Sequence, residues 1–163
     1  MELIIIKSLK NSWGEIMDIL RISNMKDINL SKAINELYML TNFNRTQYPK
    51  YTEWFYNKMV PRIFNKTGEV LFLMDHFVIE GLIIIKDDKD EKKLCQIYTN
   101  EEYRKRGICH SLLEESFTIL GTDKPKITIP QFRLDEFNNI ISKYGWIESE
   151  ELDSYSSKEI AFN

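Results

Sequence analysis

The segment from Leu94 to Gly121, LCQIYTNEEYRKRGICHSLLEESFTILG, constrains the fold more than any other part of the chain. It starts as a short β-prone run that ends in polar residues. After Gly107 the apolar residues recur at helical spacing, beginning with Cys109, and Gly121 stops the pattern as glycine commonly does at a helix C-terminus. The segment therefore predicts a strand, a short basic loop and an amphipathic helix in direct succession.

The loop between this strand and this helix has the composition of an anion site. It contains three cationic residues and a glycine, namely Arg104, Lys105, Arg106 and Gly107. The helix that follows points its first backbone N–H groups and the positive end of its dipole toward whatever lies over the loop. A diphosphate suits such a helix start, and Gly107 has no side chain to block its approach to the backbone.

The stretch YRKRGICHSLLEE resembles the acetyl-CoA signature of the GNAT superfamily of N-acetyltransferases, whose loop reads R/Q-x-x-G-x-G/A between the fourth strand and the third helix. Arg104 and Gly107 match the first and fourth positions, and Cys109 stands where the family has Gly or Ala. Gly81 in VIEGLIII and Trp146 in YGWIE are similar to two further family positions. The alternative is a surface loop whose basic residues are merely solvated.

The resemblance implies an α/β fold with a central mixed β-sheet flanked by helices, as one N-acetyltransferase domain over residues 1–163. It implies acetyl-CoA as cofactor and direct transfer of its acetyl group to a primary amine within a ternary complex. By position, the main chain of Ile97, Tyr98 and Thr99 would bind the pantetheine arm. The diphosphate would lie against the loop and the helix start, at Arg104, Lys105, Arg106, Gly107, Ile108, Cys109, His110 and Ser111.

The residues for proton transfer depart from the family pattern. The usual acid is a tyrosine four residues before the Gly of the last helix, where this chain has Ile141, and an acidic residue common before the loop is here Lys93. Tyr144 lies one helical turn from Ile141 and about 60° round the axis. Its hydroxyl is a candidate acid, the alternative being a half-buried tyrosine at a helix end. The missing acid favours the rival function, an acyl-CoA-binding regulatory or sensor module without catalysis.

Glu80 is the only charged residue in the apolar strand expected over residues 77–85. Because an unpaired charge is seldom buried, Glu80 is either a candidate base that reaches the acceptor cleft or part of a salt bridge at the rim of the sheet, which we favour. The family's acceptor site corresponds to a region with four aromatic residues, although such a cluster is more often core. These residues are Tyr48, Tyr51, Trp54 and Tyr56.

Two residues of the helix start leave a choice of role. His110 could contact a phosphate, or it could be an exposed histidine without a role. Cys109 at a helix N-terminus could have a lowered thiol pKa. It falls, however, on the apolar stripe with Leu112 and Leu113, and we favour packing.

Composition limits the class of protein and its partners. With 163 residues, 43% hydrophobic and 29% charged, the chain is a globular domain with a core. The net charge of −3 argues against nucleic-acid binding. Its aliphatic runs are too short to cross a bilayer and its start is unlike a signal peptide, so we expect no membrane partner and a cytoplasmic protein, monomeric or homodimeric. Cys95 and Cys109 have neither zinc-ligand spacing nor a disulfide pattern, which predicts no metal site.

Hydrophobic periodicity predicts the remaining elements. In the N-terminal part we expect a strand over residues 2–8 and three helices, over residues 16–20, 33–40 and 49–59. The first helix follows a capping-box pattern from Ser12 to Glu15, and Pro61 should lie beyond the end of the third. Further along we expect strands over residues 70–74, 77–85 and 127–129, a helix over residues 134–144 and a closing hairpin over residues 147–162.

The sequence leaves four kinds of acceptor amine open: a peptide N-terminus, a lysine, a polyamine and an aminoglycoside.

Overall fold

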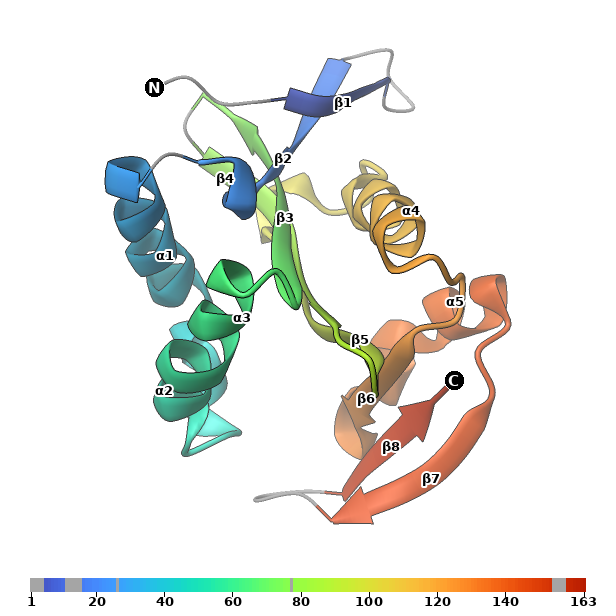
Figure 1. Ribbon diagram of the computed structural model, residues 1–163. Helices are drawn as coiled ribbons and strands as arrows, with labels where there is room; N and C mark the ends of the chain where they lie inside the picture. The colour runs from blue at the N-terminus through green and yellow to red at the C-terminus, as the bar shows by residue number, and fades with distance from the viewer. Residues whose placement is uncertain (1–4, 11–15, 26, 77, 154–157) are drawn as a thin grey trace.

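The computed structural model describes residues 5–10, 16–25, 27–76, 78–153 and 158–163, which form one sheet with helices on both faces (Figure 1). The described strands form an eight-stranded sheet in the order β1-β2-β3-β4-β5-β6-β8-β7. Neighbouring strands are antiparallel, with the exception of the parallel pair β5 and β6. The strands are β1 Ile5–Lys10, β2 Ile16–Arg21, β3 Gly68–Asp75, β4 Val78–Asp87, β5 Lys92–Thr99, β6 Lys126–Pro130, β7 Glu148–Asp153 and β8 Lys158–Phe162.

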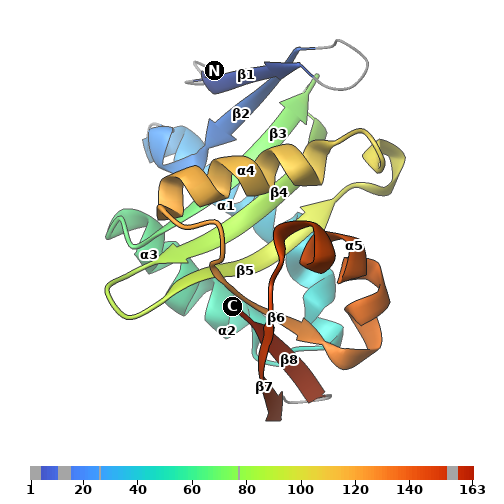
Figure 2. The same ribbon diagram turned by 90° about the vertical axis from the view of Figure 1, so that its right-hand side faces the viewer.

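Helices α1, α2 and α3 lie on one face of the sheet, and α4 and α5 lie on the other (Figures 1 and 2). Their bounds are α1 Asp27–Thr41, α2 Tyr51–Trp54, α3 Val60–Phe64, α4 Ile108–Leu120 and α5 Leu134–Tyr144. A π-helical turn, η3 Phe55–Met59, joins α2 to α3, and four short 3-10 turns complete the set: η1 Ile22–Asn24, η2 Asn42–Thr46, η4 Glu101–Tyr103 and η5 Gln131–Arg133. Among the described residues, no helix is both long and apolar enough to cross a membrane.

The central strand β4 divides the core into two clusters. Ile83 and Ile85 pack toward α4, whereas Leu82 and Ile84 pack toward α1, α2 and α3. All four side chains are almost completely buried. An apolar run on both faces of a strand is what helices on both sides of a sheet produce, and the predicted burial of this strand on both faces is confirmed.

The prediction of a helix over residues 16–20 is wrong, because these residues form β2 and pair with β1 and β3. Ile19 packs into the cluster under α4, and Leu20 packs into the cluster under α1. A strand buried on both faces is apolar at successive positions, and over five residues such a run cannot be distinguished from part of a helix. The capping-box pattern from Ser12 to Glu15 lies outside the described residues.

The prediction that the third helix stops before Pro61 is also wrong, since helical structure continues to Phe64. The Val60 N–H donates to the Phe55 carbonyl, which makes the turn before Pro61 a π turn. Pro61 thus stands in the first turn of a new α-helical segment, where a missing N–H costs least.

The local predictions from β3 onward are confirmed with small changes of boundary. The hairpins β3-β4 and β7-β8, strand β6 and helix α5 lie where the pattern placed them. β5 starts at Lys92, two residues earlier than predicted, and leads through the basic loop to α4. The predicted fold class, a mixed sheet flanked by helices, is confirmed.

Candidate functional site

Strands β5 and β6 separate after a short parallel contact. Their register joins Lys93 to Lys126 and Leu94 to Ile127, and no further pair follows among the described residues. A cavity of about 400 Å³, which we call the gap cavity, lies between residues 94–99 and residues 127–130. The other edge of β5 is paired with β4 as far as Thr99. The main chain of residues 95–99 therefore has an edge free for an extended ligand, and Ile97, Tyr98 and Thr99 line it.

The start of α4 is open beside this cavity. Gly107 caps the helix with a left-handed φ of 83°, and among the described residues no atom beyond Gly107 and its two chain neighbours lies within 4 Å of the position that a Cβ would take there. The Ser111 N–H donates to the Gly107 carbonyl at 3.0 Å as the first intrahelical bond. The N–H groups without an intrahelical acceptor are consequently those of Ile108, Cys109 and His110.

The cationic side chains of the loop are exposed. An Arg104 nitrogen lies 3.6 Å from a Glu101 carboxylate oxygen, and its side chain is 60% exposed. The Arg106 guanidinium lies 5.0 Å from the centre of the Tyr103 ring. Lys105 adopts a left-handed φ of 64°, which turns the chain sharply just before Gly107. These contacts are weak and solvated, so the loop can exchange them for contacts with an anion.

A third region, the loop cavity, has a volume of about 500 Å³ and lies between the loop, α4 and α5. It shares lining residues with the gap cavity, among them Ile97, Thr99 and Arg104. The strand edge, the loop and the helix start thus surround one connected space. Among the predicted residues, Arg104, Lys105, Gly107, Ile108, Cys109, His110 and Tyr144 line the loop cavity.

Tyr144 is held at the contact between α4 and α5. Its hydroxyl donates to Glu114 Oε1 at 3.0 Å and contacts His110 Nδ1, and its ring packs edge-on against Phe117 and Trp146. Burial raises the pKa of Tyr144, and the hydrogen bond to the Glu114 carboxylate raises it further. The phenol therefore stays protonated at neutral pH.

Ile108 is buried and Cys109 is half-buried, and both residues line the loop cavity. Ile108 is 1% exposed, and a Cβ on Gly81 would lie 2.7 Å from its Cγ2. Gly81 thus lets the start of α4 approach β4 closely. Burial raises the pKa of the Cys109 thiol to about 11, so packing, not an activated thiolate, is the correct interpretation.

Glu80 lies in an irregularity of β4. The register of β3 and β4 shifts between Gly81 and Ile79, which leaves Glu80 as the extra residue, and its carbonyl accepts the Asn100 N–H at 2.8 Å. Its side chain is 8% exposed and lines neither the gap cavity nor the loop cavity. Its role as a base stays a prediction that these cavities do not support.

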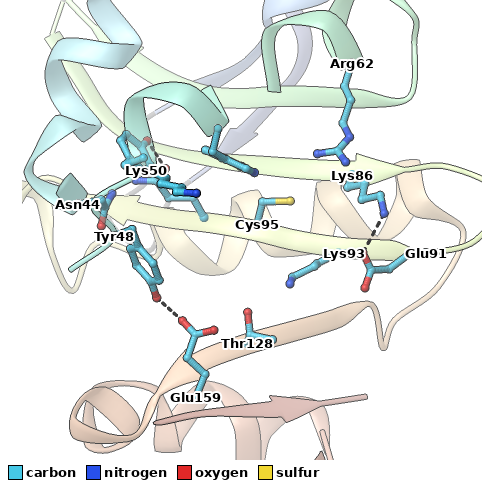
Figure 3. A pocket seen from close by; sticks show the side chains of 13 residues that line it. Asn44, Tyr48, Lys50, Arg62, Lys86, Glu91, Lys93, Cys95, Thr128 and Glu159 are labelled. Atoms are coloured by element: carbon cyan, nitrogen blue, oxygen red, sulfur yellow. Dashed lines mark hydrogen bonds and ion pairs between the residues drawn. The ribbon is translucent and has the colours of Figure 1, made fainter. Parts of the chain in front are cut away.

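A further cavity of about 460 Å³, the side cavity, opens on the α2 side of β5 (Figure 3). The register of β4 and β5 shifts at Cys95, and both Cys95 and Gln96 line this cavity. Gln96 Oε1 accepts the Tyr51 hydroxyl at 2.8 Å, and burial raises the pKa of Tyr51 to about 12. Asn44, Tyr48, Cys95, Gln96 and Thr128 line both the side cavity and the gap cavity, so the two adjoin.

Tyr48 and Glu159 meet where these cavities adjoin (Figure 3). The Tyr48 hydroxyl donates to Glu159 Oε1, and burial, assisted by this carboxylate, raises the pKa of Tyr48. Three of the four aromatic residues that the sequence singled out, Tyr48, Tyr51 and Trp54, line the side cavity. Tyr56 instead packs on Tyr38 with ring centres 5.0 Å apart. Sequence reasoning missed Glu159, because nothing in the tail hairpin indicates which strand it joins.

Comparison with known proteins identifies the fold. No family model and no curated protein matches the chain. Among solved structures, the chain is similar to a protein from Desulfovibrio desulfuricans that is assigned to the GNAT family of acetyltransferases. The two are 12% identical with a TM-score of 0.54, and the match covers 65% of this chain and 73% of that one. The ribosomal-protein-S18-alanine N-acetyltransferase from Escherichia coli matches at 16% identity and a TM-score of 0.52, covering 60% and 68%. The chain has the GNAT acyltransferase fold.

A third structure with the GNAT fold is a chimera of the spermidine N-acetyltransferase from Vibrio cholerae. It matches at 18% identity with a TM-score of 0.50, over 68% of this chain and 73% of that one. At these identities the similarity establishes how the chain is folded. What the site binds and does must be argued from its own residues.

Proposed function

We propose that the protein is an acetyl-CoA-dependent N-acetyltransferase that acts on a primary amine. The observation that carries the proposal is the unpaired edge of β5, which leads into an open helix start at Gly107. An extended, amide-containing arm fits the unpaired edge of β5, and a diphosphate fits the helix start. Acetyl-CoA contains both groups in this order.

The residues present fit the cofactor. The main chain of Ile97, Tyr98 and Thr99 would hydrogen-bond the pantetheine arm along the gap cavity. The N–H groups of Ile108, Cys109 and His110 would hold the diphosphate, with Arg104, Lys105 and Arg106 around it. We assign Ser111 a smaller part, because its N–H already bonds Gly107.

When bound, acetyl-CoA supplies an activated acetyl thioester, and the protein contributes mainly position. The gap cavity and the side cavity adjoin, so an amine in the side cavity can lie next to a ligand in the gap. That arrangement supports direct transfer in a ternary complex. Glu159 is the carboxylate at the junction, and its oxygen can accept a hydrogen bond from an amine.

Proton transfer in this proposal rests on few protein groups. Tyr144 stays protonated and lines the loop cavity, but its hydroxyl already bonds Glu114 and His110. We therefore assign protonation of the leaving thiolate to water, with Tyr144 as the protein alternative. The second function, a binding module without catalysis, is favoured by this scarcity of available acids.

Thermal unfolding with acetyl-CoA and CoA tests cofactor binding. A ligand that binds only the folded state adds about 2.7 kcal/mol at a hundredfold excess over its dissociation constant. Release of free CoA thiol over a panel of amines then separates the enzyme from the binding module. No thermal shift with millimolar acetyl-CoA would refute both functions, whereas a shift without thiol release over a broad panel would favour the binding module.

A further inference from the structure

The side cavity carries more positive than negative charge, although the whole chain has a net charge of −3. Its lining contains two carboxylates, Glu91 and Glu159, and four cationic side chains, Lys50, Arg62, Lys86 and Lys93. Such an excess within a concave site attracts an anion. Which of these cations is available depends on its partners.

One of the four cations is already neutralised. The Lys86 ammonium lies 2.9 Å from Glu91 and 3.0 Å from Asp88, and its side chain is 16% exposed. These two carboxylates bring the pKa of Lys86 above its usual value, with the hydrogen bond to Glu91 the largest cause. The positive charge of Lys86 is therefore balanced by these two carboxylates and is not available to a ligand.

Arg62 and Lys93 differ from Lys86 because neither forms a salt bridge within 4 Å among the described residues, although Lys93 is near enough to Glu91 to help lower the pKa of that carboxyl. Both are half-buried, and Figure 3 shows them entering the side cavity from α3 and from β5. A cation withdrawn from water is expected to have a counter-charge. Lys50, the remaining cation, is exposed.

A neutral donor in the same cavity also lacks a partner. Gln96 Oε1 accepts the Tyr51 hydroxyl, while Gln96 Nε2 is buried and has no hydrogen-bond partner in the described part of the chain. Buried amide donors are seldom left unpaired. This nitrogen is shielded from solvent, so the groups that the cavity offers to an acceptor oxygen are the two cations, Arg62 and Lys93.

The side of the cavity toward the gap cavity has the opposite character, since Glu159, which lines the side cavity, accepts the hydroxyl of Tyr48, which lines both cavities. A carboxylate that accepts one hydrogen bond from a phenol keeps capacity for an ammonium or amine donor. In Figure 3, Glu159 and Tyr48 lie at one end of the cavity, while Arg62 and Lys86 lie at the other. Both ends belong to one cavity of about 460 Å³, so a molecule that extends along it would contact both.

We propose that the acceptor is a small amine that also bears an anionic group, a carboxylate or a phosphate, with the amine at Glu159 and the anion at Arg62 and Lys93. This inference rests on the proposed function and names the class of its second substrate. In the reaction the ammonium group first loses a proton to solvent, and the free amine nitrogen then bonds to the acetyl carbon while the thioester C–S bond breaks. The nitrogen loses a second proton to solvent and the leaving thiolate takes one up, so that the products are the N-acetylated acceptor, still carrying its anionic group, and free CoA thiol.

The experiment compares amines that differ only in the anionic group. 5-Aminopentanoate is compared with 5-aminopentanamide, and phosphoethanolamine with ethanolamine, first by calorimetric binding to the protein with CoA and then by thiol release with acetyl-CoA. We expect the anionic member to bind at least about tenfold more tightly in one of the two sets, since a charge-assisted hydrogen bond is lost in its partner. The set in which this occurs distinguishes a carboxylate from a phosphate.

Matched variants assign the preference to the cavity. R62Q and K93Q should each lose most of the discrimination, whereas K58Q, which removes an exposed cation of the neighbouring turn η3, should keep it. Circular dichroism melts would verify that all three fold. The proposal would be overturned if the anionic and neutral amines bound equally in both sets, or if R62Q and K93Q kept the full preference for the anionic amine. In either case a thermal shift with CoA would leave the proposed function standing. Failure of the CoA shift would instead refute the proposed function, and this inference with it.

Discussion

The two basic regions of the molecule, the loop before α4 and the side cavity, present their cations in different ways. At the loop the cations are exposed, and the specific feature is backbone, namely the helix start at Gly107. In the side cavity three of the four cations are half-buried, and the specific feature is which of these three lacks a salt bridge. We therefore expect main-chain changes to dominate at the loop and single charges to dominate in the cavity.

The largest effect should come from Gly107→Val. It should abolish the thermal shift with acetyl-CoA, about 2.7 kcal/mol at a hundredfold excess of cofactor, because a branched side chain would fill the space over the helix start. Gly121→Val is the matched control. Gly121 also has a left-handed φ, of 64°, with nothing within 4 Å, but lies at the far end of α4. Both variants should lose similar stability, and an unchanged shift in the Gly107 variant would show that the loop is not the cofactor site.

In the side cavity, Glu159→Gln should weaken the acceptor and spare the cofactor. The amide can still accept the Tyr48 hydroxyl, so the fold is kept, but it no longer attracts an ammonium group. We expect KM for the amine to rise about tenfold, as for loss of one charge-assisted hydrogen bond. Glu148→Gln, at an exposed position of β7, is the control. A parent-like KM in the Glu159 variant would remove this carboxylate from amine binding.

Lys86→Gln tests the paired cation of the cavity through pH. The hydrogen bond from Lys86 holds the pKa of Asp88 below its usual value. Burial alone would raise the pKa of Glu91, but Lys86 and nearby cations outweigh burial and lower it. Carboxyls with a lowered folded pKa stabilise the fold above their unfolded pKa, which is about 4. This contribution is lost as pH falls through the lower folded values.

The variant should therefore be less stable than the parent at neutral pH, by about 1 kcal/mol or less for a partly exposed pair. The difference should shrink as pH falls below about 4, the usual carboxyl pKa. Urea unfolding across pH measures it. Lys32→Gln, which breaks an exposed pair with Glu36 on α1, should change little. A difference in the Lys86 variant that does not depend on pH would show that packing, not charge, is lost.

At the loop, Arg104→Ala should reduce the acetyl-CoA shift only slightly. The side chain is exposed and its ion pair with Glu101 is solvated, so we expect a loss below about 1 kcal/mol. High salt should make the loss smaller still, since exposed charges are screened. A loss as large as that in the Gly107 variant, or one insensitive to salt, would contradict the distinction between backbone and side chain.

The smallest effect is expected for Tyr144→Phe, which keeps the ring against Phe117 and Trp146. If water protonates the thiolate, turnover should stay within about twofold of the parent across neutral pH, whereas a positioned acid contributes about a hundredfold or more. Turnover at saturating acetyl-CoA is the measurement. A drop of tenfold or more with unchanged cofactor affinity would make Tyr144 the acid.

Predictions from sequence succeeded where the cause of structure is local. Gly145 adopts the left-handed φ of 67° that ends α5, and Gly107 has the φ of 83° that starts α4. The prediction of a helix over residues 16–20 was wrong, because burial on both faces of a strand depends on which helices cover the sheet. The same limit applied to Pro61, whose place in a helix depends on the π turn before it.

The sequence by itself determined the order of elements from β3 onward and the place of the basic loop between β5 and α4. These follow from periodicity and from glycines, which act within a few residues. Only the tertiary structure decided that Tyr48 meets Glu159, 111 residues away, and that Arg62 and Lys93 enter the same cavity with no salt bridge to any described residue. The physical reason is that pairing depends on distances across the sheet, and the order of strands that sets them leaves no local mark in the sequence.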